Sequence, residues 1–389
     1  MSVAVASNRL ERQKVRIRPV EAVAASRPSR RLSRLKAWFQ RNVVEGIFLR
    51  RQVERFFLVF GGHIFFQTLD AASRFDLFTL LKNHNGMTRQ QICEELGIEE
   101  QPARIMLLGL VSSGMIKKRG EVYKNTRMAN EVLCSDSQTN LLPYIALQRH
   151  VMYKGMPKFY ESIKEFRNCG LEEFSGDEPT LYQRLAHDPE VEEVFHDSMS
   201  ALSVQTNKIL ADYVDLSGVK SLVDIGGGDG TNIITLTAKY PKLQGRVFDL
   251  PTVADLARAQ LAAHPNAARL GAVNGNCFED DLPTDADCFL LAHFCTIWSP
   301  ERNKQLLKKC FDALPSGGRV VIFNMMQHND ETGPLSAAVG SPYFLTIATG
   351  EGMLYTWNEY EQWARESGFA DVKQVKLPRD HGAIVAIKA

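Results

Sequence analysis

The chain has 389 residues, of which 44% are hydrophobic and 23% charged, and its formal net charge is +1. This length exceeds one core of ordinary size, so we expect two domains. The balanced charge argues against a general nucleic-acid-binding or acid-rich protein. Residues 9–51 are nevertheless basic, with eleven arginines and two lysines against three glutamates. Because no apolar segment follows these arginines, we interpret residues 1–35 as a solvated, poorly ordered tail rather than a targeting peptide.

No stretch reaches the roughly 18 uncharged apolar residues of a membrane span, so we expect no membrane partner and a cytoplasmic protein. The seven cysteines include no C-x-x-C pair. This usage is typical of reduced, mostly buried side chains, and neither disulfides nor a metal site need be invoked.

Helical patterns begin near residue 35. Large apolar residues crowd residues 53–81 too densely for a one-sided surface helix, which indicates helices buried in a core or across a subunit contact. Thr88 begins the next helix with Gln91 at the capping-box position, and Gly97 ends it.

A second apolar helix covers residues 105–112, and strands at 115–117 and 121–124 form a small hairpin after it. Helix, turn, helix and wing make a winged-helix pattern, which reads DNA in many proteins. Together with the turn before residue 105, the second helix carries Arg104 as its only cation. Few side chains are therefore available to recognise DNA bases. A structural or dimerisation role is favoured, and no nucleic-acid partner is expected.

Residues 140–204 are interpreted as further helices, so residues 36–204 are predicted to form one helical domain. The remainder, residues 205–389, alternates strands with helices, which predicts a mostly parallel sheet covered on both faces, with ligands at the carboxyl ends of its strands. Strands are expected at 221–225, 245–249, 272–274, 286–292, 319–323, 372–376 and 382–387, and helices at 230–240, 254–263, 301–313 and 355–367.

A glycine cluster follows the first of these strands and opens a helix, so that backbone there can approach a ligand closely. It is a poor dinucleotide fingerprint, because G-x-G-x-x-G would need glycine where Thr231 stands. It matches the D-x-G-x-G-x-G motif of class I methyltransferases, read as Asp224, Gly226, Gly228 and Gly230.

A carboxylate, Asp249, ends the next strand about 20 residues further on, where a nucleotide-binding sheet places its ribose ligand. Leu250 beside it can lie against adenine. Taken alone, Asp249 could equally be a helix cap or a turn residue. Together with the glycine cluster, it favours a ribose-binding role.

From about residue 50 the chain resembles the small-molecule O-methyltransferases, a family that includes caffeate, hydroxyneurosporene and polyketide methyltransferases. This resemblance implies an α/β fold, with a Rossmann-like class I methyltransferase domain preceded by an all-α, winged-helix-containing dimerisation domain. It also implies S-adenosylmethionine as cofactor, a small-molecule substrate and a homodimer. The residues that carry the match are Phe195, Met199, 224–230, 248–251, Gly275, Asn276, 314–318 and 367–369.

The resemblance also implies roles for individual residues. Gly226 and Gly228 would line the methionine moiety, and Asp249 and Leu250 would hold ribose and adenine. Asn276, which stands in place of the usual aspartate, and Cys277 would flank adenine. Ser203 would lie near the methionine carboxylate, and Met199 would face the acceptor. Trp298 matches the tryptophan of the family motif.

The departures concern the acid/base group of the family. Thr296 stands where a catalytic histidine is usual. Asn324 and, approximately, Leu354 occupy the positions of the two acids that orient that histidine. His293 is near in sequence but is expected on a different face, as a structural histidine.

A phenol or alcohol that attacks a methyl group must lose its proton, and a positioned histidine normally takes it. Without that base, three chemistries remain open: methylation of an electron-rich carbon or nitrogen, O-methylation of a self-ionising acceptor, or a different reaction of S-adenosylmethionine. The motif region is also similar to bacteriochlorophyllide C-methyltransferases. We therefore expect methyl transfer to carbon or nitrogen of a specialised metabolite, helped by alignment. Candidate pocket aromatics are Phe65, Phe66, Tyr182, Trp298 and Tyr343.

Two alternatives stay open. The chain could cyclise S-adenosylmethionine to azetidine-2-carboxylate with release of methylthioadenosine, as azetidine synthases similar to this family do. Tyr182, Asn324 or Thr296 would then help to remove the amine proton. Alternatively, a cofactor-binding winged-helix protein could use its basic arm on nucleic acid.

Overall fold

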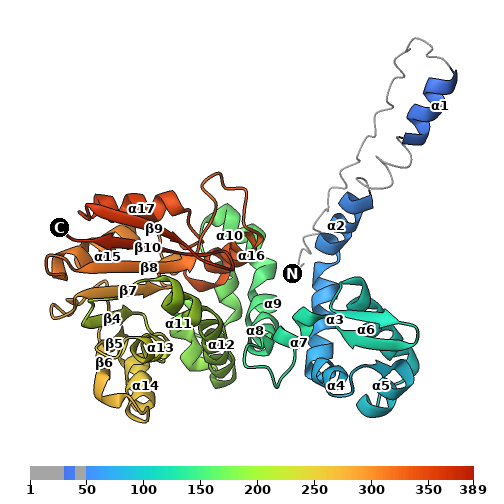
Figure 1. Cartoon of the computed structure of the whole chain (residues 1–389), viewed down its shortest axis with the longest axis horizontal. Coiled ribbons are helices and arrows are strands. Elements are labelled where there is room, and N and C mark those ends of the chain that lie inside the picture. The colour runs from blue at the N-terminus through green and yellow to red at the C-terminus, as the bar shows by residue number, and fades with distance from the viewer. Residues whose placement is uncertain (1–29, 40–49) are drawn as a thin grey trace, which may run out of the picture. The chain divides into compact units, whose positions relative to one another are not determined.

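The computed structural model describes residues 30–39 and 50–389, and its chain divides after His63 into an N-terminal unit and a larger unit, Ile64–Ala389 (Figure 1). Most of the predicted basic tail lies outside the described residues. Helix α1 (Arg30–Phe39) begins before residue 35, so helical structure starts earlier than the pattern indicated. Among the described residues, no helix is long and apolar enough to cross a membrane.

Helix α2 (Arg50–Phe60) completes the N-terminal unit. Its large apolar side chains, Val53 and the residues from Phe56 to Phe60, are 45–84% exposed. The predicted burial of residues 53–81 in a core is therefore met for Ala72, Leu77, Phe78 and Leu81 but not, within one chain, for residues 53–60.

The larger unit starts with the predicted winged-helix arrangement. Thr88 and Gln91 form the capping box, and Gly97 ends that helix with a left-handed φ of 63°. The wing is a three-stranded sheet in the order β1-β3-β2. Its elements are α3 (Gly62–Arg74), α4 (Leu77–Asn83), β1 (Met87–Thr88), α5 (Arg89–Leu96), α6 (Glu100–Ser112), β2 (Ile116–Arg119), β3 (Val122–Asn125) and α7 (Arg127–Val132).

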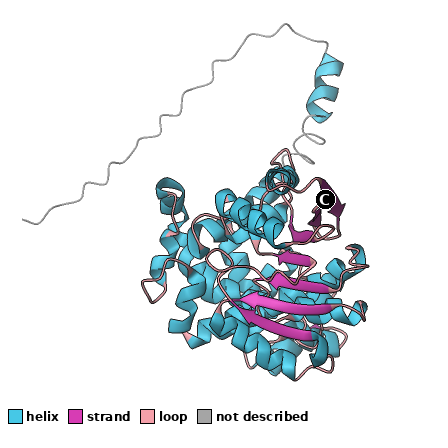
Figure 2. Ribbon diagram, turned by 90° about the vertical axis from the view of Figure 1, so that its left-hand side faces the viewer, coloured by secondary structure: helices cyan, strands magenta, loops and turns pink. Residues whose placement is uncertain are grey.

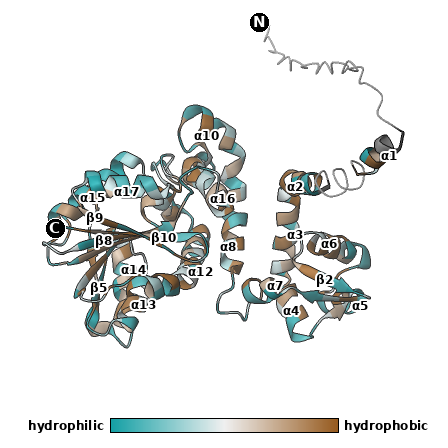
Figure 3. Ribbon diagram, turned by 45° about the horizontal axis from the view of Figure 1, so that its top comes forward, coloured by the Kyte–Doolittle hydropathy of each residue, from teal (hydrophilic) through white to brown (hydrophobic). Residues whose placement is uncertain are grey.

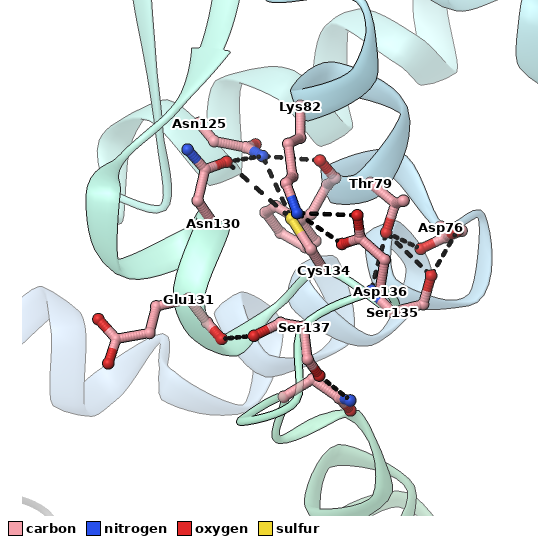
Figure 4. A network of polar contacts seen from close by, with 12 residues as sticks. Asp76, Thr79, Lys82, Asn125, Asn130, Glu131, Cys134, Ser135, Asp136 and Ser137 are labelled. Carbon is pink, nitrogen blue, oxygen red and sulfur yellow. Dashed lines mark hydrogen bonds and ion pairs between the residues drawn. The ribbon is translucent and has the colours of Figure 1, made fainter.

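A network of polar contacts ties α4 to the segment after α7 (Figure 4). Thr79 Oγ1 donates to Asp76 Oδ1 at 2.6 Å and accepts from the Ser135 amide at 2.8 Å. Lys82 Nζ lies 2.8 Å from both carboxylate oxygens of Asp136. The network fixes where the chain leaves the winged-helix region.

Helices then connect this region to the large sheet. The ion pair between Arg149 and buried Asp70, with Nη1 and Oδ1 2.6 Å apart, and the stacked rings of Phe66 and Tyr153 hold α3 against them. The longest, α12, contains the domain boundary expected at residues 204 and 205. These elements are α8 (Leu142–Leu147), η2 (Gln148–Met152), α9 (Tyr153–Gly155), η3 (Met156–Lys158), α10 (Phe159–Glu165), η4 (Cys169–Glu173), α11 (Leu181–Arg184), η5 (Leu185–His187) and α12 (Pro189–Tyr213).

The C-terminal part is built on a sheet whose strands are magenta in Figure 2. The sheet has seven strands in the order β6-β5-β4-β7-β8-β10-β9. All neighbouring pairs are parallel except those of β10, which runs antiparallel to β8 and β9. The strands are β4 (Ser221–Ile225), β5 (Gln244–Asp249), β6 (Leu270–Asn274), β7 (Cys288–Ala292), β8 (Arg319–Met325), β9 (Asp371–Lys376) and β10 (His381–Ile387).

Hydrophobic cores cover both faces of this sheet. On one face α12, α13 and α14 pack, and on the other α15 and α17 (Figure 3), so the central strands β4, β7 and β8 are buried on both sides. The expected strands and helices of this half are thereby confirmed. The helices are α13 (Thr231–Lys239), α14 (Pro251–Ala262), α15 (Pro300–Ala313) and α17 (Trp357–Glu366).

Helix α16 (Leu335–Tyr343), which continues into a π-helical turn, η8 (Phe344–Ala348), was not expected from the sequence. Pro342 lies inside the helix, and small residues interrupt its apolar pattern. Backbone and side-chain contacts hold it in place, including the Leu354 amide donating to Ser341 Oγ at 3.2 Å.

Candidate active site

The glycine loop leaves β4 with backbone that other residues adopt only under strain. Gly226 and Gly228 have φ values of +69° and +55°. A Cβ on Gly226 would lie 2.3 Å from Phe294 Cδ2, whereas a Cβ on Gly228 would meet nothing within 4 Å. The loop is therefore closed on the Phe294 side and open at Gly228, where a ligand can approach the backbone.

Asp249 lies next to this opening, at the end of β5. Its Oδ2 accepts from the Gly228 amide at 3.0 Å and its Oδ1 from the Leu250 amide at 2.8 Å. Burial raises the pKa of this carboxyl above its ordinary value. A carboxylate keeps further lone pairs when two are used, so it can still accept ribose hydroxyls. Leu250 is 41% exposed beside it and offers an apolar surface to a base.

Asp224 is the second-last residue of β4, just before the loop, and is fully buried. Its Oδ2 accepts from Asn232 Nδ2 at 2.9 Å, but its Oδ1 is buried without a partner. Burial raises the pKa of Asp224 to about 7. A buried carboxyl with an open oxygen is a costly arrangement that a polar ligand can complete.

A contact that the sequence reasoning missed ties α12 to the loop. Ser200 Oγ donates to Asp229 Oδ2 at 2.8 Å, and Asp229 Oδ1 accepts from the Thr231 amide at 2.9 Å. Ser203 lies one helical turn after Ser200 and is half-buried. The Ser200 contact brings this part of α12 to the loop, and Asp229 within the glycine cluster was the signal that could have revealed it.

Asn276 and Cys277 follow β6 on the same edge of the sheet. The Asn276 side chain accepts from the Phe278 amide at 3.1 Å through Oδ1, which leaves Nδ2 as the group that can reach a ligand. Cys277 is 7% exposed, and burial raises the pKa of its thiol to about 12. It is therefore a neutral, packed side chain rather than a nucleophile.

Trp298 follows η7 (Cys295–Ile297), the turn after β7. Its ring meets Phe278 edge to face with centroids 4.8 Å apart, and the Arg302 guanidinium carbon lies 5.1 Å from its centroid. The indole nitrogen is buried without a partner. Arg302 was not singled out from the sequence, because its role depends on this stacking.

Neither Thr296 nor Asn324 has a side chain that can act as a base and take up a proton. Thr296 is 4% exposed and its hydroxyl donates to the His293 carbonyl at 3.2 Å. Asn324, at the end of β8, is fully buried, and both its side-chain atoms lack a partner. The Leu354 segment lies against η7, since a Cβ on Gly352 would meet the Thr296 and Ile297 carbonyls.

His293 packs among rings, as expected of a structural histidine. Its centroid lies 5.1 Å from that of Phe323 and 5.3 Å from that of His381. Burial lowers the pKa of His293 to about 3, so it stays neutral near neutral pH.

Tyr182 and Tyr343 are brought together in a cluster with Phe195 and Met199. Burial raises the pKa of both hydroxyls above the ordinary value. A phenol held protonated can donate a hydrogen bond but cannot serve as a base. Phe66 lies elsewhere, stacked on Tyr153 in the winged-helix region.

The edge therefore carries an open glycine backbone, a carboxylate beside it, an exposed leucine and buried polar atoms without partners. These groups fit a nucleoside with a charged amino-acid end. All seven cysteines are free, and among the described residues no group of three or more histidines, cysteines or acids is arranged to hold a metal ion.

Comparison with known proteins agrees with this site. Residues 160–370 match the O-methyltransferase domain, and residues 57–135 match the O-methyltransferase dimerisation domain. The chain is 35% identical to the L-tyrosine C(3)-methyltransferase of Streptomyces lavendulae, over 85% of this chain and 91% of the relative. It is 30% identical to the 3-hydroxy-5-methyl-1-naphthoate 3-O-methyltransferase of Streptomyces sahachiroi, over 83% and 92%.

Among solved structures, the apo form of the S-adenosylmethionine-dependent methyltransferase SibL aligns with a TM-score of 0.75 at 32% identity, covering 85% of this chain and 98% of that one. These similarities support neither cyclisation of S-adenosylmethionine nor a regulatory winged-helix protein. The chain belongs to the small-molecule O-methyltransferase family with an N-terminal dimerisation domain, and it is an S-adenosylmethionine-dependent methyltransferase of specialised metabolism.

Proposed function

We propose that this enzyme methylates a ring carbon of a phenolic amino acid of the L-tyrosine class. The observation that carries the proposal is the neutral lining around η7 and the end of β8, where Thr296 and Asn324 stand and neither titrates near neutral pH. The 35% identity with an L-tyrosine C(3)-methyltransferase supports the same substrate class.

The chemistry explains why a base is dispensable for this reaction. When bound, S-adenosylmethionine supplies an electrophilic methyl group on a sulfonium. The carbon next to a phenol oxygen is electron-rich, so it forms the new bond with its own electron pair while the methyl–sulfur bond breaks. The ring then loses its C–H proton to water, and one proton is released in total. The protein contributes alignment, which is a large catalytic term in itself.

We assign the cofactor to the edge described above. Asp249 and Leu250 would hold ribose and adenine, with Asn276 and Cys277 flanking the base. Gly226, Gly228, Asp224, Ser203 and Trp298 would surround the methionine end. Tyr182, Tyr343 and Met199 would line the acceptor side, the phenols as hydrogen-bond donors.

The assembly is a homodimer in this proposal, with residues 36–204 as the helical dimerisation domain and 205–389 as the catalytic domain. A groove of about 420 Å³ between α3 and α6 is the proposed subunit contact. Gln67, Ile105 and Met106 are among the residues that line this groove. Ile105 and Leu108 on α6 are 65% and 69% exposed. Apolar side chains this exposed are typical of a subunit contact, and they lie within the dimerisation match.

The test is product analysis with L-tyrosine and S-adenosylmethionine, read by NMR and mass spectrometry. We expect a ring-methylated tyrosine and S-adenosylhomocysteine in equal amounts. An O-methyl or N-methyl product, or methylthioadenosine in place of S-adenosylhomocysteine, contradicts the proposal.

A further inference from the structure

Among the described residues, Asn324 stands out because two of its side-chain polar atoms are buried without a partner. Its side chain is 0% exposed, and neither Oδ1 nor Nδ2 has a hydrogen-bond partner. Buried amides are nearly always paired in native proteins, because an orphaned donor or acceptor keeps its full desolvation cost. This one stands at the carboxyl end of β8, the edge where ligands of such sheets bind.

The direction of the side chain follows from strand alternation. Val320, Ile322 and Met326 belong to the core on the α15–α17 face, so Asn324 between them projects to the same face. That core also contains Cys295 and Tyr355. The Tyr355 hydroxyl donates to the Trp298 carbonyl at 2.6 Å, which brings the chain around η7 to this face.

Further buried polar atoms without partners come from the elements that meet here. The Trp298 indole nitrogen follows η7, and the Thr346 hydroxyl belongs to η8, which packs against η7. Buried polar atoms without a partner also occur elsewhere in the described residues, for example on Asn125 and Glu161. Those of Asn324, Trp298 and Thr346 come from elements that contact one another around η7, and together they would offer a ligand both donors and acceptors.

We propose that Asn324 binds the phenol oxygen of the acceptor and thereby directs the methyl group to the neighbouring ring carbon. This inference rests on the proposed function. Asn324 Oδ1 accepts a hydrogen bond from the phenol O–H. Asn324 Nδ2 donates a hydrogen bond to the phenol oxygen of the substrate or to a water molecule beside it. To reach the amide, the acceptor displaces the side chains that cover it.

An amide and an imidazole have opposite consequences for the phenol. A histidine removes the proton and leaves an oxygen nucleophile, whereas an amide leaves the proton on oxygen and engages it. The oxygen then stays bonded to hydrogen while the ring carbon forms the carbon–carbon bond and the methyl–sulfur bond breaks. The ring C–H proton leaves to water afterwards, so the phenol is regenerated and one proton is released.

Binding of L-tyrosine and L-phenylalanine tests this without turnover. Both affinities are measured by calorimetry on the full chain saturated with S-adenosylhomocysteine. We expect the wild type to prefer L-tyrosine by about tenfold or more, because a site built for a hydroxyl rejects the analogue that lacks it. In Asn324→Leu the preference should fall to about threefold or less, mainly through weaker tyrosine binding.

Folding does not confound this variant. Leucine has a similar shape and removes two unpaired polar atoms, so the melting temperature should stay the same or rise. Asn358→Leu, which changes an exposed amide at the start of α17, is the matched control and should keep the wild-type preference. A purely structural role for Asn324 would lower the melting temperature and leave the preference unchanged.

Product analysis adds a second arm. Asn324→Asp introduces a group that can take the phenol proton, so O-methyltyrosine should appear and its share should grow with pH. If the wild type makes ring-methylated tyrosine but Asn324→Leu keeps the tyrosine preference, or the wild type has none, the inference is overturned and the proposed function stands. If the wild type makes no ring-methylated product, both are overturned.

Discussion

Asp224→Asn should remove a pH dependence of stability that the glycine loop imposes on the ligand-free enzyme. Asparagine has the shape of the carboxyl and can still accept from Asn232 Nδ2 through its carbonyl. It never has to carry charge in a site that is fully buried and has an unpaired oxygen.

The size of the effect follows from the pKa of Asp224, which burial raises from 3.8 to about 7. Between these values the folded chain binds more protons than the unfolded chain, so stability falls as pH rises. The contribution of Asp224 to the free energy of unfolding is fully present below pH 3.8. It declines by about 1.4 kcal/mol per pH unit as the pH rises and is lost above about pH 7. The whole change is about 4 kcal/mol.

Urea unfolding between about pH 5 and pH 8 measures this. The gain in free energy of unfolding from Asp224→Asn should grow between pH 5 and pH 7 and then stay level. Asp285→Asn is a control of opposite sign, because its hydrogen bond to Arg246 lowers the pKa of that exposed carboxyl. An Asp224→Asn gain that is constant across this pH range would refute the reasoning.

Other expectations concern the cofactor loop and the subunit contact. Gly226→Ala should abolish S-adenosylhomocysteine binding in calorimetry because its Cβ would clash with Phe294 at 2.3 Å, whereas Gly228→Ala, with open space there, should weaken binding by only about tenfold through its positive φ. Asp249→Asn should weaken S-adenosylhomocysteine binding by about 10- to 100-fold through loss of charge-assisted hydrogen bonds. Binding to the wild type should also weaken in acid, because the Asp249 carboxyl, whose pKa is raised, is protonated there. An affinity that does not change with pH would argue against this role of Asp249. Ile105→Glu should convert a dimer to a monomer in light scattering, and an unchanged mass would exclude the α3–α6 groove as the contact.

Local signals made much of the fold predictable. The strand at 221–225 coincides with β4, because apolar residues run directly into a cluster of glycines, which weaken a strand and favour a turn. The capping box at Thr88 was equally predictable from the sequence, since its two partners, Thr88 and Gln91, are three residues apart. By contrast, α16 has neither periodicity nor a good helix-forming composition, and its position depends on contacts such as that between Leu354 and Ser341.

The sequence indicated which residues to consider for the candidate site, but not how they are buried or paired. The absence of a histidine at Thr296 is visible in the sequence, whereas the engagement of its hydroxyl by the His293 carbonyl is not. Likewise Tyr182 was a candidate base until its burial showed that it stays protonated. Burial and pairing are tertiary properties, so residue type alone could not separate a base from a donor.

A neutral acceptor site is consistent with the energetics of this reaction. The methyl group on a sulfonium is already electrophilic, so holding a carbon nucleophile in line supplies much of the rate enhancement and proton abstraction becomes secondary. Polar groups that hold the cofactor or the acceptor must be rigid and unpaired before that ligand binds, which lowers the stability of the empty enzyme. Asp224, Trp298 and Asn324 all show this signature at one edge of the sheet. The same cost that makes these residues anomalous in the folded chain is what would make them selective for a ligand that completes their hydrogen bonds.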